Sequence, residues 1–215
     1  MTDDRDRWNE RYRDDDFELP DDPVPELARR IDTLPEGRAL DVATGSGRNA
    51  IFLAEHGYDV EAVDVSDEAL AQAHTRADEL GLEVDWIRAD VTDSDGEFQL
   101  EPREYDLIVV SFFYAPALLP ELKEALAPGG VLVYEHHLRS SDPVEVGPSD
   151  DRVRFRSNDL LRSCLDLTVL HYAEATRHGK EDGRPSTIAT VVARKSCGGA
   201  QSYPPERDMR DVPRE

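Results

Sequence analysis

The feature that most constrains the fold is the stretch 39–54, in which an apolar run leads into a loop of small residues and then a helical pattern. The apolar run predicts a buried strand. The loop contains Gly45 and Gly47, which lack the Cβ atoms that would hinder a sharp turn or the close approach of a ligand. The first N–H groups of the helix then favour electron-rich atoms. This order predicts an α/β fold that holds a ligand against its main chain.

The same loop fits the dinucleotide fingerprint G-x-G-x-x-G/A, with Gly45, Gly47 and Ala50 at the three fixed positions. Asp64 lies nineteen residues after Gly45 (64 − 45), at the end of the next apolar run, where an acid can bind a ribose. A Gly-x-Gly sequence alone is weak evidence, since many lie in ordinary loops. With the strand, the helix and the acid beside it, the loop predicts a site for a nucleoside-type cofactor.

Residues 39–195 alternate apolar runs with amphipathic ones, which predicts an α/β domain with one Rossmann-like, doubly wound and mostly parallel sheet. We expect strands at 39–43, 59–64, 83–88, 105–110 and 131–135, and helices at 48–56, 67–80 and 120–127. Two further strand-like runs, 167–172 and 186–194, are joined by a polar connection without a helical pattern. They predict an antiparallel hairpin at the C-terminal end, which brings the sheet to seven strands.

The flanking segments are polar. Residues 1–38 predict a helical preamble, in which Trp8 and Tyr12 share one helical face and either pin the helix to the body or form a lid over the site. The loop 138–156 is expected to be too polar for the core, and Ser157 to cap a short helix ending at Cys164. Residues 196–215 predict a disordered tail.

The net charge is −22, from 47 acids against 25 bases. Such a field repels phosphate backbones and anionic lipid surfaces, which argues against nucleic acid and membrane partners. The dense carboxylates resemble those of halophilic proteins, in which molar salt mutes self-repulsion. The acidic N-terminus, the absence of a long apolar run and only two cysteines predict a cytoplasmic protein without a disulfide framework. The oligomeric state stays open.

Ligands on such a sheet bind beyond the carboxyl ends of its strands. Asp64 ends the second expected strand, and Asp90 and Ser111 follow the third and fourth; their oxygens suit ribose hydroxyls or an adenine amine. Asp41 is different, because an acid inside a buried apolar strand is costly unless it is paired or meets a cation. A cofactor with an amine or a sulfonium would explain it better than a nicotinamide dinucleotide.

Five segments together resemble the class I methyltransferases that use S-adenosylmethionine (SAM): Leu40-Asp-Val-Ala-Thr-Gly-Ser-Gly47, Ala62-Val-Asp-Val-Ser66, Arg88-Ala-Asp-Val91, Asp106-Leu-Ile-Val-Val110 and Pro128-Gly-Gly130. Trp8-x-x-x-Tyr12, Gly47-Arg-Asn49 and Arg177-His178 are similar to the branch with tellurite-resistance and thiopurine methyltransferases. The resemblance implies an enzyme that transfers a methyl group from SAM to a small-molecule acceptor. Ala43 departs from the pattern, which commonly has glycine there.

The resemblance also implies site residues. Those for the cofactor are Asp41, Ala43, Thr44, Gly45, Gly47, Asp64, Val65, Asp90, Val91 and Ser111. Arg177 and His178 are the catalytic candidates, and the other candidates for substrate contact are Trp8, Tyr12, Phe112, Tyr114, His136 and His137. No metal is expected, because neighbouring histidines on a strand point to opposite faces. Positioning is the main catalytic tool for such a transfer, which does not strictly require a general base.

Two alternatives remain open at this point. An NAD-dependent oxidoreductase would satisfy the literal fingerprint, although Asp41 and the Pro128-Gly129-Gly130 turn count against it. A non-catalytic SAM-binding protein is the other alternative, because no residue in the sequence is chemically obligatory for catalysis.

Overall fold

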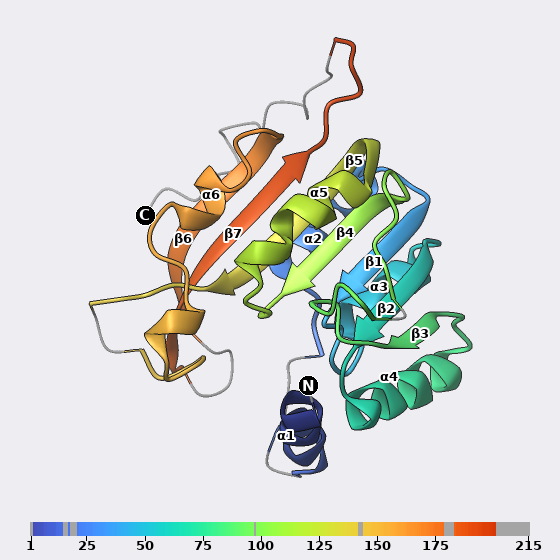
Figure 1. The fold of residues 1–215 in the computed structure, drawn as a ribbon, viewed down its shortest axis with the longest axis vertical. Coiled ribbons are helices and arrows are strands. Elements are labelled where there is room, and N and C mark those ends of the chain that lie inside the picture. The colour runs from blue at the N-terminus through green and yellow to red at the C-terminus, as the bar shows by residue number, and fades with distance from the viewer. Residues whose placement is uncertain are drawn as a thin grey trace.

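A computed structural model describes residues 2–14, 17, 21–96, 98–141, 144–178 and 183–200. Within them, seven strands form one sheet in the order β3-β2-β1-β4-β5-β7-β6 (Figure 1). The strands are β1 (Arg38–Val42), β2 (Asp59–Asp64), β3 (Asp85–Arg88), β4 (Tyr105–Ser111), β5 (Leu126–His137), β6 (Thr168–His178) and β7 (Pro185–Arg194). Strands β1 to β5 pair in parallel, and β7 runs antiparallel between β5 and β6. The doubly wound sheet with its C-terminal hairpin is thus confirmed.

Helices cover both faces of the sheet. They are α1 (Thr2–Arg13), α2 (Pro25–Arg30), α3 (Arg48–Glu55), α4 (Asp67–Leu80), α5 (Leu119–Ala125) and α6 (Asp159–Arg162), with the 3₁₀ turns η1 (Ile31–Thr33), η2 (Pro116–Leu118) and η3 (Asp151–Val153). In Figure 1, α5 and α6 lie in front of the sheet and α2 and α3 behind it. A hydrophobic core lies on each face of the sheet, and β1 contributes to both. Leu40 and Val42 pack with α5 and α6, while Ala39 packs with α2 and α3.

The strand order reverses at β1, which lies between β2 and β4. The carboxyl ends of β1 and β4 therefore diverge into loops on opposite sides of the sheet and leave a crevice at that point. Figure 1 shows α1 beyond the arrowheads of β1 and β4, at this end of the sheet. This is where the sequence predicts the ligand.

Several helix and strand limits agree with those predicted from the sequence. Strand β2 and helix α4 have the predicted limits. The hydroxyl of Ser66 accepts a hydrogen bond from Ala69 N at 3.1 Å and caps α4, and Gly81, with φ +68°, ends it in the left-handed conformation. Within the helical preamble, α2 is followed directly by η1.

The hairpin differs from its prediction. Arg177 and His178 were expected in the connection, but they belong to β6, where they pair with Ser186 and Pro185 of β7. Strand β5 also begins earlier than expected, at Leu126, and the ladder with β4 shifts register around Pro128-Gly129-Gly130. Both differences arise because main-chain pairing with a neighbouring strand continues through residues whose side chains are polar or small.

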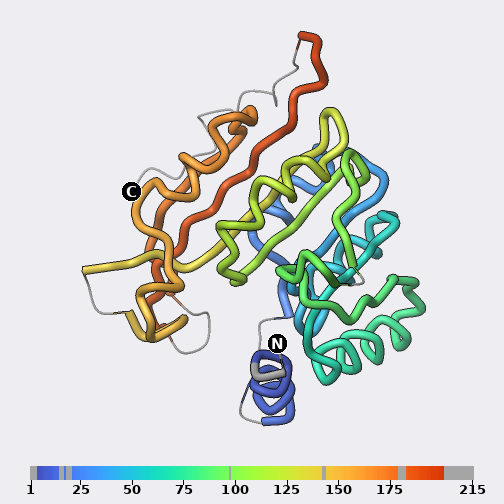
Figure 2. The backbone as a smooth tube through the Cα atoms, in the orientation of Figure 1, coloured from blue at the N-terminus to red at the C-terminus, as the bar shows by residue number. Residues whose placement is uncertain are grey.

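Two expectations for the segment after β5 were wrong. Leu138 and Phe155 form a bridge between the two ends of the loop and are buried in the core, so the loop is not wholly outside it. Figure 2 shows the described part of this segment, in gold, turning back beside β6 and β7. Ser157 does not cap α6, because its hydroxyl donates to Glu174 Oε2 at 2.7 Å and Asn158 precedes the helix.

At the C-terminal end, 196–200 form neither helix nor strand, and the rest of the predicted tail, 201–215, lies outside the described residues. No helix in the described part of the chain is long and apolar enough to span a membrane.

Candidate functional site

The loop after β1 is held in a tight, partly left-handed path. Ala43, Gly45 and Gly47 have φ angles of +54°, +57° and +80°. Thr44 N donates to Val63 O at 3.0 Å, which ties the loop to β2. Ala43 takes a conformation that is easier for glycine, so a methyl group at this position is tolerated at a cost of roughly 1–2 kcal/mol.

Gly47 is needed for packing as well as for its φ angle. A Cβ there would lie 2.8 Å from Ala73 Cβ of α4 and 2.9 Å from the indole of Trp86 in β3. A side chain at this position would therefore push α4 and β3 away from the start of α3.

Asp64, at the end of β2, joins two loops. Its Oδ2 accepts from Gly45 N and its Oδ1 from Ser66 N, both at 2.9 Å. The residue is only 8% exposed, and burial raises the pKa of its carboxyl. Asp64 is therefore not the simple cleft residue that we expected, because it also supports the loop around Gly45. Each carboxylate oxygen keeps a second lone pair, so ribose hydroxyls remain possible partners.

Asp41 lies fully buried in β1. Its Oδ2 accepts from the hydroxyl of Thr44 at 2.5 Å, and its Oδ1 lies 3.5 Å from the amide nitrogen of Asn49. Burial raises the pKa of its carboxyl to about 6. The costly acid of the apolar strand is therefore stabilised by the cofactor loop itself, so the site is partly assembled by this contact.

Asn49, in α3, connects three segments, although the sequence indicated it only as part of a motif and gave it no role in the site. Its amide donates to the hydroxyl of Ser111 at 3.1 Å, and its oxygen accepts from Val24 N at 3.0 Å. It is 1% exposed. The available signal was a polar residue on an otherwise apolar helix face, beside Ala50 and Leu53. Asn49 thus joins the ends of β1 and β4 across the strand-order reversal.

The predicted adenine residues follow β3. Asp90 Oδ1 accepts from the main chain and the hydroxyl of Thr92, at 2.9 and 2.7 Å, so it closes its own turn. Val91 lines an open pocket of about 320 Å³ between this turn and the segment after β4. The pocket is lined by Val91, Thr92, Ser94, Tyr114, Ala115, Pro116, Ala117, Leu118 and Glu121. The structure brings Val91 and Tyr114 together, which sequence separation alone did not predict.

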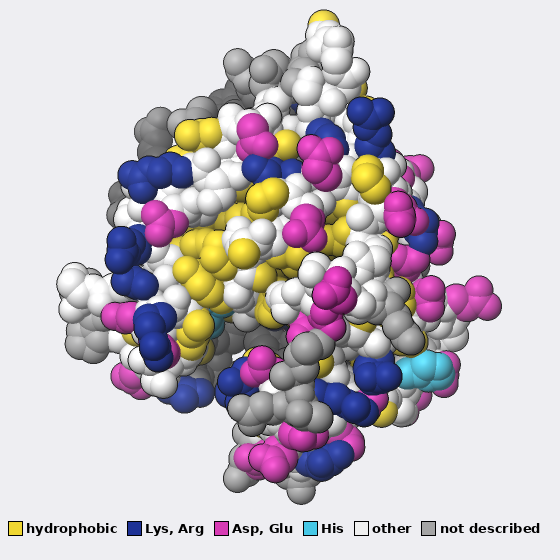
Figure 3. Space-filling model, viewed as in Figure 1, with side chains coloured by type: hydrophobic (Ala, Val, Ile, Leu, Met, Phe, Trp, Pro, Cys, Tyr) yellow, Lys and Arg dark blue, Asp and Glu magenta, His cyan; other side chains and the backbone are white. Residues whose placement is uncertain are grey.

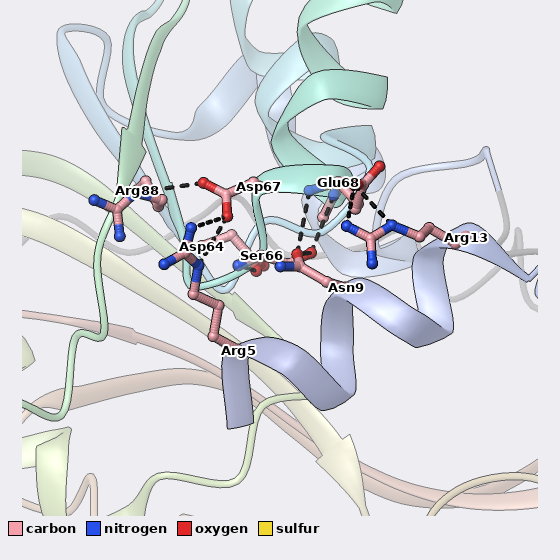
Figure 4. A network of polar contacts seen from close by, with 9 residues as sticks. Arg5, Asn9, Arg13, Asp64, Ser66, Asp67, Glu68 and Arg88 are labelled. Atoms are coloured by element: carbon pink, nitrogen blue, oxygen red, sulfur yellow. Dashed lines mark hydrogen bonds and ion pairs between the residues drawn. The ribbon is translucent and has the colours of Figure 1, made fainter. Parts of the chain in front are cut away.

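Helix α1 is fixed to α4 by polar contacts (Figure 4). Arg5 Nε and Arg13 Nε each donate at 2.8 Å, to Asp67 and Glu68 respectively, and Asn9 Oδ1 accepts from the hydroxyl of Ser66 at 2.7 Å. The neighbouring Tyr12 is largely buried, and its pKa is raised by burial and by the negative charge of Asp64. The helix is therefore pinned to the body, and it also brings Tyr12 towards the site.

A buried ion pair occupies the other side of the crevice. Glu135, at the carboxyl end of β5, has a side chain that is 2% exposed and accepts from Arg177 Nη1 at 2.7 Å. Thr190 of β7 contributes its hydroxyl, 3.0 Å from Glu135 Oε2 and 3.2 Å from Arg177 Nη2. His178 is exposed and, as the next residue of β6, faces away from Arg177, so the structure does not bring the two together.

The histidines at the end of β5 are buried. His136 Nε2 lies 2.9 Å from Val153 O, and burial lowers its pKa to about 4. The ring of His137 lies 4.8 Å from that of Phe112, and burial lowers its pKa to about 3. Both rings are therefore neutral near neutral pH. The described residues contain no group of three or more side chains placed to hold a metal ion.

Comparison with known proteins identifies the family. Residues 39–130, which span β1 to the start of β5, match the family described as a methyltransferase domain. The chain therefore contains a methyltransferase domain. This match agrees with the interpretation of the sequence and with SAM as the cofactor.

Individual proteins are similar to part of this chain. The release factor glutamine methyltransferase of Bacteroides thetaiotaomicron is 34% identical over 140 residues, 62% of this chain and 46% of its own length. Hemagglutinin 1 of Eikenella corrodens is 28% identical over 180 residues, 79% of this chain and 58% of its own length. The chain thus spans about half the length of these curated relatives. The crystal structure of TehB from Haemophilus influenzae superimposes with a TM-score of 0.68 at 20% identity, covering 89% of this chain and 67% of that one.

Proposed function

We propose that this methyltransferase transfers a methyl group from SAM to a small-molecule acceptor. The observation that carries the proposal is the meeting of Asp41, Asp64 and Ser111 around the left-handed loop at the strand-order reversal. An ordinary loop that contained Gly45 and Gly47 by chance would not need the buried acids Asp41 and Asp64 beside it. The arrangement suits a ligand with a ribose diol and a cationic end.

The residues present fit the cofactor. Asp64 would accept the ribose hydroxyls, the main chain of the loop from Ala43 to Gly47 would contact the methionine part, and Asp41 would act on its amine through Thr44. Val91 and the pocket beside it would receive the adenine. SAM supplies a methyl carbon whose bond to the sulfonium sulfur breaks as a lone pair of the acceptor bonds to that carbon, leaving S-adenosylhomocysteine.

The acceptor would enter between α1 and the ends of β5 and β6. Figure 3 shows a hollow between the body of the molecule and α1, with basic and acidic side chains at its lower edge. Phe112 and Arg177 are the described residues that we assign to acceptor contact, because both are partly exposed next to the end of β4. A helix pinned over the crevice supports a small acceptor rather than a macromolecule.

Charge and cysteine chemistry support the remaining parts of the proposal. A net charge of −22 disfavours nucleic acid as the acceptor. Cys164 and Cys197 are both free, as is usual in the reducing cytoplasm, where we place the reaction.

The decisive test of turnover is release of S-adenosylhomocysteine from SAM in the presence of thiols, amines, phenols and metalloid oxyanions, with a small-molecule extract as a further source of acceptors. We expect release that depends on one acceptor class. Bound SAM without release in any mixture would contradict the proposal and favour the non-catalytic alternative. Reduction of NAD with a hydroxy-acid panel would favour the oxidoreductase instead.

A further inference from the structure

Glu135 and Arg177 lie near the carboxyl ends of β5 and β6, on the side of the crevice that we assign to the acceptor. Glu135 aligns with Ser111 of β4 and Thr190 of β7, so it lies one strand beyond the end of β4. Its side chain is almost fully buried, whereas that of Arg177 is 34% exposed. The guanidinium of Arg177 is therefore the solvent-accessible group of the pair, and the buried carboxylate of Glu135 holds it in position.

Arg48 brings a second guanidinium to the same place from the first turn of α3. Its guanidinium carbon lies 5.4 Å from the ring of Phe112, and the main-chain N–H of Phe112 donates to Glu135 O at 2.9 Å. Burial lowers the pKa of Arg48, and Glu135 and Arg177 are among the charges that act on it. Its hydrogen bond within the described residues goes to the main-chain oxygen of Asp22, at 3.3 Å, which is neutral. Arg177 thus pairs with Glu135, and Arg48 lies beside Phe112 at the neighbouring strand end.

Phe112 places an aromatic surface beside these arginines. Its ring centroid lies 5.4 Å from the guanidinium carbon of Arg48, and the side chain is 38% exposed. Its φ angle of +55° is unusual for a bulky residue and directs the chain sharply away from the end of β4. Such strain is retained mainly where the surrounding structure or a function demands it.

The other titratable groups nearby do not supply a matching negative charge. His137, against Phe112, is neutral near neutral pH because burial lowers its pKa. Tyr12 stays protonated because burial and Asp64 raise its pKa. Asp41 also acts on Arg48, but its carboxylate is bonded to Thr44 on the side of the cofactor loop.

We propose that the methyl acceptor carries an anionic group that binds between Arg48 and Arg177, with its apolar part against Phe112. The inference rests on the proposed function. Guanidinium groups bind carboxylates and other oxyanions through paired, charge-assisted hydrogen bonds. On a molecule whose overall charge repels anions, a local pair of arginines selects the position at which an anion binds.

Binding to the protein saturated with S-adenosylhomocysteine tests this directly. The probes are 4-hydroxybenzoate, 4-aminobenzoate and 3-mercaptopropionate, each compared with its own methyl ester, which lacks the charge and carries one more methyl group. We expect at least one acid to bind at least about tenfold more tightly than its ester, equivalent to about 1.4 kcal/mol. Arg48→Gln and Arg177→Gln should each reduce that preference to within about threefold.

Two variants control the experiment. Arg152→Gln removes an arginine that is 88% exposed and pairs with Asp150 outside the crevice, so the preference for the acid should persist. Glu135→Gln combined with Arg177→Gln removes both charges of the buried pair, so it should fold even where Arg177→Gln alone is unstable, and still lack the preference. Equal binding of acids and esters by the parent protein, or a preference unaffected in the double variant, would overturn the inference.

Titration with SAM in parallel separates the two proposals. Failure of the parent protein to bind SAM contradicts the proposed function. Normal SAM binding without any preference for an acid contradicts only the anionic acceptor.

Discussion

The carboxylate of Asp64 accepts main-chain N–H groups from Gly45 and Ser66, which belong to the loops after β1 and β2. A ribose would therefore meet an acid whose orientation is already fixed by the protein. Such preorganisation lowers the entropic cost of binding, because the side chain does not need to be ordered by the ligand.

Asp64→Ala should weaken SAM binding by at least about tenfold, because it removes charge-assisted hydrogen bonds. It should also lower the free energy of unfolding by about 1–3 kcal/mol, since two buried N–H groups lose their acceptor. Calorimetric titration and urea unfolding measure the two effects. Asp59→Ala, an exposed residue at the opposite end of β2, is the matched control and should change neither. Unchanged SAM affinity in Asp64→Ala would remove Asp64 from the site.

Asp41 should make stability depend on pH. Burial raises its pKa from 3.8 to about 6, so folding favours the protonated form. The corresponding stabilisation is complete below the ordinary pKa and is lost as the pH rises through about 6. Relative to Asp41→Asn, the parent protein without cofactor should therefore lose up to about 3 kcal/mol over this range.

Urea unfolding of both proteins across this pH range, at constant high salt, checks the prediction. Asp59→Asn serves as the control, because it alters an exposed acid on the neighbouring strand. A difference between Asp41→Asn and the parent that stays constant with pH would show that Asp41 titrates normally.

Residues at strand ends were predictable because the end of an apolar run in the sequence marks the end of a buried strand. Asp64 and Ser111 could thus be assigned to one edge of the sheet, with Asp41 inside the strand between them. The structure joins Asp41 to Ser111 through Asn49, and Asp64 supports the loop at Gly45. Glu135 could not be assigned, because its partner Arg177 is 42 residues away (177 − 135) and only the hairpin register places them together.

At the scale of elements, α1 touches the body through α4, and Asn9 is its most buried contact, at 7% exposed. If α1 is a lid, SAM should slow amide hydrogen exchange throughout this helix. Asn9→Ala should abolish that protection and weaken SAM binding, because the hydrogen bonds to Ser66 and to Glu68 N are lost. Hydrogen exchange followed by mass spectrometry checks this.

Glu10→Ala, an exposed substitution on the same helix, should behave as the parent protein does. Exchange in α1 that is indifferent to SAM would mean that Trp8 and Tyr12 only pin the helix.

Element limits were predictable where capping chemistry is local, as at Ser66 and Gly81. They were not predictable where tertiary pairing decides. The extension of β6 through Arg177, the bridge between Leu138 and Phe155, and the shifted register at Pro128 depend on neighbours that are distant in sequence.

For the whole molecule, the net charge is −22, and on the face shown in Figure 3 acidic side chains are spread among basic ones. If this surface is an adaptation to salt, the melting temperature should rise as KCl increases from tens of millimolar to molar. The screening length falls from about 30 Å to about 3 Å between the dilute and molar limits, which relieves self-repulsion. Choline chloride should raise the melting temperature by the same amount as KCl. Melting temperatures that stay flat or fall with salt would contradict the adaptation.

The central claim is that the loop between β1 and α3 holds SAM against Asp64. Calorimetric titration of the parent protein and Asp64→Ala with SAM and with NAD, at high salt, tests it most directly. The account predicts one SAM bound per chain, displacement by S-adenosylhomocysteine, affinity at least about tenfold weaker in Asp64→Ala, and no heat from NAD. Binding of NAD without SAM, or SAM affinity that is equal in both proteins, would contradict it.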